Sequence, residues 1–132
     1  MGYRILVIED NPTNMELMTY LLTAFGHTTI AAQTGEEGVA AALRERPDLI
    51  LCDLALPQLD GYGVARQLRE ESRLSAVPLI AVTASAMTGD RDKVIAAGFD
   101  GYISKPITPE TFVAEVEGYL QRKQGYGDDP RR

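Results

Sequence analysis

The chain of 132 residues contains no tryptophan, one cysteine and one histidine. A single cysteine excludes a disulfide within the chain, and this usage fits a reducing compartment. Because Cys52 lies in an apolar run, we expect a small buried side chain there and not a reactive thiol. His27 follows a glycine in a predicted surface turn, and we interpret it as an ordinary loop residue.

Long apolar runs and an excess of basic residues are also missing. No run approaches the ~18–20 apolar residues that a membrane span needs, and residues 1–10 lack the basic head and apolar stretch of a signal peptide. The formal net charge is −6 and the pI is about 4.7. Because an acidic chain repels a phosphate backbone, we expect neither nucleic acid nor a membrane among its partners, and we predict a cytoplasmic protein.

What the sequence does contain is an alternation of short apolar runs with amphipathic stretches. This pattern predicts five strands interleaved with five helices in one domain, residues 3–123, followed by a loose tail at 124–132. Such alternation is typical of an α/β fold, in which a parallel sheet carries helices on both faces. Right-handed crossovers favour the doubly wound strand order 2-1-3-4-5. The strands are expected at 3–8, 28–31, 48–52, 79–83 and 101–104.

Polar residues mark where several of the helices begin. Asn11, Thr34 and Thr108 are typical N-caps, because their side-chain oxygens can accept hydrogen bonds from free backbone N–H groups of the first turn. The third helix is expected to end near Glu71, and a weaker helix is expected from about 89 to 97.

Charged residues directly follow three of the predicted strands. Glu9 and Asp10 follow the first strand, Asp53 the third and Lys105 the fifth. Because the carboxyl ends of parallel strands meet at one edge, where ligands bind, we expect three acids and a lysine to converge there. Carboxylates this close need compensation, which a hard cation such as Mg²⁺ supplies while keeping open positions. The alternative is that Glu9 and Asp10 only favour the helix N-terminus behind them.

This set of residues suits phosphoryl chemistry. An aspartate beside Mg²⁺ can act as a nucleophile toward a phosphoryl group. The metal and the ammonium of Lys105 can neutralise charge on the phosphoryl oxygens. Thr83 ends the fourth strand, so its hydroxyl can hydrogen-bond a phosphoryl oxygen. Taken alone, Thr83 is an ordinary strand residue and Tyr102 an aromatic at the edge of the core.

Four motifs stand in order along the chain: Leu6-Val-Ile-Glu-Asp-Asn-Pro12, Leu51-Cys-Asp-Leu-Ala-Leu-Pro57 with Asp60-Gly61, Val82-Thr-Ala84, and Tyr102-Ile-Ser-Lys-Pro106. Together they resemble the receiver domain of two-component response regulators, the CheY-like family, over about residues 4–122. The resemblance implies the flavodoxin-like (βα)5 fold. The motifs at Ala84-Ser-Ala-Met87 and at 102–105 also resemble single-domain cell-cycle regulators of the DivK type and receivers fused to hybrid kinases.

The resemblance implies that Asp53 is the phosphoacceptor, which takes a phosphoryl group from a histidine kinase or a histidine phosphotransfer protein. Mg²⁺ would be bound directly by Asp10, Asp53 and the backbone carbonyl of Ala55, and by Glu9 through water. The only reactions implied are the protein's own phosphorylation and dephosphorylation. The family therefore implies a regulator and not a conventional enzyme.

The resemblance also assigns the groups around the phosphoryl group. Thr83, the backbone amide of Ala84 and Lys105 would bind it, and the Lys105–Pro106 peptide bond would be cis. Thr83 and Tyr102 would form a switch in which the Tyr102 ring turns inward. The helix at 89–97, the fifth strand and the last helix would then present a changed face to a protein partner. The regulator would be a monomer or a phosphorylation-dependent dimer.

Three other interpretations stay open on the residues alone. A Mg²⁺-dependent phosphohydrolase would also use an aspartyl nucleophile, but such enzymes usually place it after the first strand and enclose the substrate with an inserted cap. A flavodoxin-like electron carrier would bind a flavin phosphate in the first loop, where Glu9 and Asp10 would repel it. A receiver excised from a longer protein is the third, although Met1 stands close to the first strand and no output domain follows residue 123.

Overall fold

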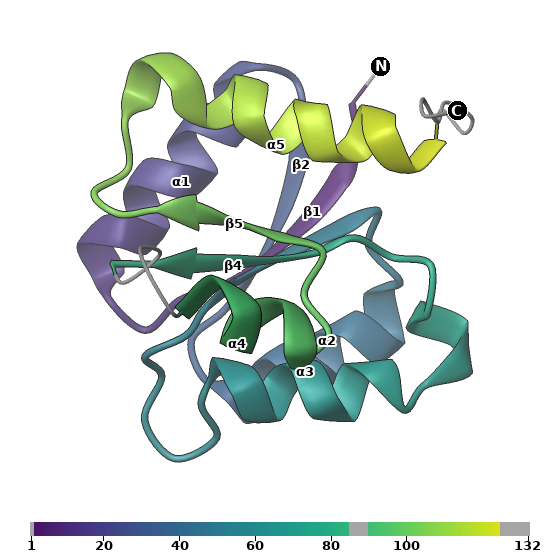
Figure 1. Cartoon of the computed structure of the whole chain (residues 1–132). Coiled ribbons are helices and arrows are strands. Elements are labelled where there is room, and N and C mark those ends of the chain that lie inside the picture. The colour runs from purple at the N-terminus through teal and green to yellow at the C-terminus, as the bar shows by residue number, and fades with distance from the viewer. Residues whose placement is uncertain (1, 85–89, 125–132) are drawn as a thin grey trace.

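The computed structural model of the chain describes residues 2–84 and 90–124 (Figure 1). Within these residues, five strands alternate with five α-helices, and one short 3-10 helix precedes the fourth strand. The strands are β1 (Arg4–Ile8), β2 (Thr28–Ala32), β3 (Leu49–Asp53), β4 (Leu79–Thr83) and β5 (Gly101–Ser104). The helices are α1 (Pro12–Ala24), α2 (Gly35–Glu45), α3 (Gly61–Arg69), η1 (Ser72–Leu74), α4 (Asp90–Ala96) and α5 (Pro109–Gln124).

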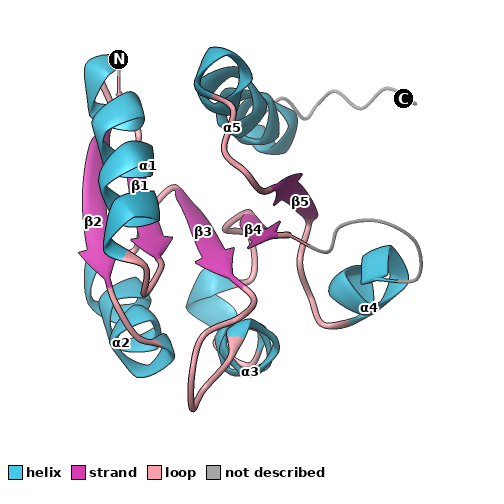
Figure 2. Ribbon diagram, turned by 90° about the vertical axis from the view of Figure 1, so that its left-hand side faces the viewer, coloured by secondary structure: helices cyan, strands magenta, loops and turns pink. Residues whose placement is uncertain are grey.

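The strands form one parallel sheet in the order β2-β1-β3-β4-β5, which confirms the predicted fold class (Figure 2). The pairing register of neighbouring strands shows which residues lie side by side where the strands end. Ile8 lies opposite Cys52, and Asp53 lies opposite Val82. Thr83 lies opposite Ser104. The residues that follow β1, β4 and β5, together with the end of β3, therefore emerge along one edge of the sheet.

Helices cover both faces of the sheet, with α1 and α5 on one side and α2, α3 and α4 on the other (Figure 1). Alternate strand residues enter the two layers: Ile5 and Val7 pack with α1 and α5, whereas Leu6 and Ile8 pack with α2 and α3. All five residues of β3 are buried, as expected for the central strand of a parallel sheet. Cys52 is fully buried there as predicted, and burial raises the pKa of its thiol.

The helix starts follow the predicted capping residues. The Asn11 side chain accepts a hydrogen bond from the Asn14 N–H, and the Thr34 hydroxyl accepts one from the Glu37 N–H. The last of the three predicted caps, Thr108, precedes α5, whose first residue is Pro109. The third helix ends at Arg69, earlier than predicted, because the chain turns into η1.

His27 corrects one prediction. It follows the turn at Gly26 as expected, but its side chain is buried, and only 6% of the residue is exposed. Its Nδ1 accepts a hydrogen bond from the Tyr3 N–H at 3.1 Å, and its Nε2 lies 2.8 Å from Oε2 of Glu117 in α5. Because a backbone N–H can only donate, Nδ1 must be the unprotonated nitrogen, and the neutral ring carries its proton on Nε2. The histidine thus ties the starts of β1 and β2 to α5.

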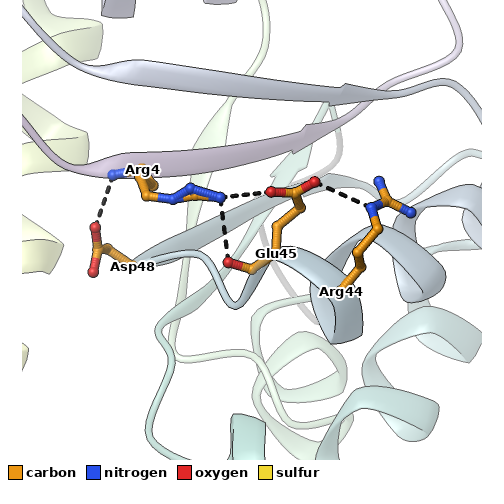
Figure 3. A network of polar contacts seen from close by, with 4 residues as sticks. All are labelled: Arg4, Arg44, Glu45 and Asp48. Atoms are coloured by element: carbon orange, nitrogen blue, oxygen red, sulfur yellow. Dashed lines mark hydrogen bonds and ion pairs between the residues drawn. The ribbon is translucent and has the colours of Figure 1, made fainter.

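The edge of the sheet at the amino ends of the strands is held by a separate polar network (Figure 3). The Arg4 N–H donates to Asp48 at 2.7 Å, and the Arg4 guanidinium pairs with Glu45 at 2.7 Å. Glu45 also pairs with Arg44 at 3.1 Å. Hydrogen bonds from the Arg4 and Arg44 guanidinium groups lower the pKa of Glu45. The network joins the end of α2 and the start of β3 to β1.

Some predictions fall where the structure gives no description. Gln124 is the last residue of α5, but the rest of the predicted tail, 125–132, lies outside the described residues. The same is true of 85–89, which include most of the Ala84-Ser-Ala-Met87 motif and the expected start of α4. The domain limits 3–123 therefore stay a prediction. In residues 2–84 and 90–124, no helix combines the length and the apolar character that crossing a bilayer requires.

Candidate functional site

Three carboxylates meet at the carboxyl edge of the sheet. Glu9 and Asp10 directly follow β1, and Asp53 is the last residue of β3. One carboxylate oxygen from each lies within 4.8 Å of the others. Glu9 and Asp53 are buried, at 1% and 4% exposure, whereas Asp10 is exposed. Such a set of hard oxygen donors with one open side fits a cation such as Mg²⁺, which binds few carboxylates and keeps several waters.

Lys105 is the cation of this cluster. Its Nζ lies 3.3 Å from Oε1 of Glu9 and 3.3 Å from Oδ2 of Asp53. Its backbone N–H donates to the Thr83 carbonyl, so the main chain of β5 is still held to β4 at this point. The peptide bond to Pro106 is cis. The three carboxylates and the one ammonium carry a formal excess of two negative charges when all of them are charged, which a divalent cation would neutralise.

Glu9 is the most constrained of the acids. Its Oε2 accepts a hydrogen bond from the Asn11 N–H at 3.1 Å. Its Oε1 is buried and, among the described residues, has no hydrogen-bond partner, although the Lys105 ammonium stands at ion-pair distance. Burial raises the pKa of Glu9 and the charge of Asp53 raises it further, while Asn11 and Lys105 act in the opposite direction. A buried acceptor without a partner is a position for water or an ion.

Asp53 is fixed through both carboxylate oxygens. Oδ1 accepts a hydrogen bond from the Ala55 N–H at 3.1 Å, and Oδ2 faces Lys105. The loop beyond it depends on Gly61, because a Cβ there would lie 2.6 Å from the Asp53 carbonyl oxygen. Glycine therefore allows α3 to begin directly against the end of β3. Sequence reasoning named Gly61 only as part of a motif with Asp60, and its place after that N-cap was the available signal for its packing role.

The remaining predicted residues lie along β4 and β5. Thr83 is buried at the end of β4, and the exposed Ala84 follows it, so both stand at the same edge as the acids. Tyr102 lies opposite Ala81, two residues before the level of Thr83, and is half-buried. The Tyr119 hydroxyl accepts from the Tyr102 N–H and donates to the Tyr102 carbonyl, both at 3.3 Å. Sequence reasoning missed this contact between α5 and β5, for which no local pattern exists.

We expect Glu9→Gln to raise the free energy of unfolding at neutral pH when Mg²⁺ is absent. The change removes a buried charge that repels Asp53 and keeps the side-chain size. The folded protein holds the Glu9 pKa above its ordinary value of 4.5. The contribution of Glu9 to stability is therefore fully present below pH 4.5 and is lost as the pH rises through the pKa of the folded protein. The variant should not show this loss.

Urea denaturation from pH 4.5 upward in the presence of a chelator measures this difference. Glu16→Gln, on the exposed face of α1, is the matched control and should follow the wild-type pH profile. Parallel pH profiles for Glu9→Gln and the wild type would show that the Glu9 carboxyl titrates normally.

Comparison with known proteins gives consistent matches. A model of the response regulator receiver domain matches residues 5–117. The polar-differentiation response regulator DivK of Brucella anthropi is 40% identical over 116 residues, which cover 88% of this chain and 94% of that protein. The DivK of Brucella ovis matches with the same identity and coverage.

Solved structures agree with these matches. The receiver domain of the sensor histidine kinase PA1611 from Pseudomonas aeruginosa has a TM-score of 0.82 and 38% identity, covering 95% of this chain and 99% of that one. That crystal structure has a magnesium ion coordinated in its active-site cleft. A crystal structure of a response regulator from Chloroflexus aurantiacus has a TM-score of 0.86 and 27% identity, covering 92% of this chain and all of that one.

Proposed function

The chain belongs to the response regulator receiver family, and from this premise we propose that Asp53 is its phosphoacceptor. Receiver domains are the phosphoaccepting regulators of two-component signalling and are not conventional enzymes. The observation that carries the assignment to Asp53 is its position: it is buried at the end of the central strand, with one oxygen held by Ala55 and the other facing Lys105. Membership of this family also disfavours the phosphohydrolase and flavodoxin-like alternatives.

The donor groups at the site fit Mg²⁺, and we assign Glu9, Asp10, Asp53 and the backbone carbonyl of Ala55 to hold it. The likeness to a receiver that binds magnesium, together with the three converging carboxylates and the unpartnered Oε1 of Glu9, supports this assignment. When bound, the ion would neutralise charge on the acids and on the phosphoryl oxygens.

Phosphoryl transfer uses Asp53 together with Lys105, Thr83 and Ala84. A carboxylate oxygen of Asp53 attacks phosphorus, the new P–O bond makes an acyl phosphate, and the bond to the donor's imidazole nitrogen breaks. Lys105 is placed to neutralise charge on a phosphoryl oxygen because its Nζ already stands 3.3 Å from Asp53. The Thr83 hydroxyl and the Ala84 N–H, at the same edge, would donate hydrogen bonds to the other oxygens.

The signal would leave through the face formed by α4, β5 and α5. We assign the switch to Thr83 and Tyr102, with the Tyr102 ring turning inward once the phosphoryl group attracts the Thr83 hydroxyl. The contact of Tyr119 with the Tyr102 backbone supports this route, because it joins α5 directly to the strand that carries the switch tyrosine. Family membership implies a histidine kinase as a partner, and we propose a phosphotransfer protein as the alternative donor and a protein as the downstream target.

We place the protein in the cytoplasm, as a monomer or as a dimer that forms on phosphorylation. The single, buried Cys52 suits a reducing compartment.

Incubation with acetyl phosphate tests the proposal. With Mg²⁺ present, intact mass spectrometry should show the gain of one phosphoryl group per chain. Removal of the metal by a chelator should suppress that gain, because the acids then repel the incoming phosphate. No gain in mass, or a gain that is equally large without a divalent ion, would contradict the proposed reaction.

A further inference from the structure

Two cations of α4 lie over aromatic rings of two different neighbours. The guanidinium carbon of Arg91 is 5.9 Å from the centre of the Tyr102 ring in β5. The Nζ of Lys93 is 5.2 Å from the centre of the Tyr62 ring in α3. Both distances fall within the range of attractive cation–π contacts. The short helix is thus joined on one side to the strand that carries the switch tyrosine and on the other side to α3.

Apolar packing holds α4 less tightly than it holds the central strands. Among its described side chains, Val94 is fully buried, whereas Ile95 is 49% exposed and both Arg91 and Lys93 are exposed. The two cation–π contacts therefore contribute a larger share of its attachment than they would on a helix with a wide apolar face.

The main chain and the ring of Tyr102 are held by different elements. Its backbone N–H and carbonyl are bound by the Tyr119 hydroxyl of α5. Its ring packs against the hydrophobic cluster on the α3 and α4 side of the sheet, beneath the Arg91 guanidinium. Movement of the ring toward Thr83 can therefore leave the backbone contacts intact, and we expect it to break the contact with Arg91.

We propose that Arg91 is a positioning residue of the switch: it holds the Tyr102 ring toward α4 and thereby favours the resting conformation, while Lys93 fixes the same helix to Tyr62. The inference rests on the proposed function, because it assumes that Tyr102 turns inward on phosphorylation. An exposed cation–π contact changes a two-state equilibrium by roughly two- to fivefold. Loss of the Arg91 contact should favour the active conformation by that factor.

A titration with beryllofluoride and Mg²⁺, followed by NMR of labelled tyrosine rings in the full chain, measures this effect. Arg91→Met removes the charge but keeps a long side chain that suits a helix, and its titration midpoint should fall roughly two- to fivefold below the wild-type value. Arg91→Lys restores a cation and should return the midpoint toward wild type. Arg66→Met is the matched control and should leave the midpoint unchanged, because Arg66 is an exposed residue of α3 whose side chain makes no ion pair or hydrogen bond with a described residue.

The resting protein provides a second measurement that needs no phosphate analogue. Arg91→Met should shift the Tyr102 ring resonances, whereas Lys93→Met should shift those of Tyr62 and leave Tyr102 in place. Both variants should speed hydrogen exchange at the α4 amides, because each releases the helix from one neighbour.

The outcomes separate this inference from the function on which it rests. A wild-type protein that shows no response to beryllofluoride and Mg²⁺ contradicts the proposed function, and the role of Arg91 in a switch fails with it. A wild-type response with an unchanged midpoint in Arg91→Met overturns the inference alone. The inference is also overturned if Arg91→Lys behaves like Arg91→Met, or if Arg66→Met shifts the midpoint as much.

Discussion

Asp53→Asn is expected to abolish phosphoryl uptake from acetyl phosphate, leaving the intact mass of the chain unchanged. An amide oxygen is too weak a nucleophile to displace the donor, although it can still accept the hydrogen bond from the Ala55 N–H. The loss should occur in a folded protein, because the substitution also removes the repulsion between two buried carboxylates, Glu9 and Asp53. Thermal unfolding measured beside the mass spectrum separates loss of the nucleophile from loss of the fold.

Asp92→Asn provides the matched control, since Asp92 is an exposed aspartate of α4 outside the acidic cluster. It should accept one phosphoryl group as the wild type does. A phosphorylated Asp53→Asn protein would place the acceptor elsewhere, with the exposed Asp10 as the next carboxylate to examine.

Lys105→Met is expected to lower the free energy of unfolding by about 2–4 kcal/mol at pH 7 without Mg²⁺. The side chains of its two partners, Glu9 and Asp53, are 0% and 4% exposed. Removing the ammonium therefore leaves buried negative charge without compensation. We set the loss slightly below that of a fully buried pair because the Lys105 side chain is 19% exposed and the solvent screens part of the interaction. Added Mg²⁺ should recover part of the loss, since the ion would supply the missing positive charge.

Urea denaturation of a double-mutant cycle with Glu9→Gln tests the cause of that loss. If the ammonium acts by compensating charge, Lys105→Met should cost clearly less when Glu9 is already neutral. An equal cost in both backgrounds would instead mean that the lysine stabilises the fold through packing of its aliphatic part.

The sequence predicts most of the fold and the meeting of the charged residues, for a physical reason. Apolar runs that end in Glu9, Asp53 or Lys105 report both a strand and its carboxyl end, and a parallel sheet places such ends along one edge. The N-caps Asn11 and Thr34 likewise mark the starts of their helices through local chemistry. These features depend on neighbouring residues in the chain, so a single sequence contains them.

Features that depend on distant partners were not predictable in this way. His27 was expected at the surface, but its partner Glu117 lies 90 residues further along, and no local pattern connects them. The burial of the Glu9 carboxyl and the contact between Arg91 and Tyr102 are likewise products of tertiary packing. Arg46 and Gln58 adopt positive φ angles of 48° and 66°, where a glycine would have been the usual signal.

The position of Tyr119 has a consequence for the behaviour of the protein at high concentration. β5 is the last strand of the sheet, and an outermost strand offers unpaired N–H and carbonyl groups to any other extended chain. The phenol of Tyr119 occupies both such groups of Tyr102, so a foreign strand would have to displace it before it could extend the sheet. In this way a single hydroxyl blocks the addition of another strand at Tyr102 on the β5 edge.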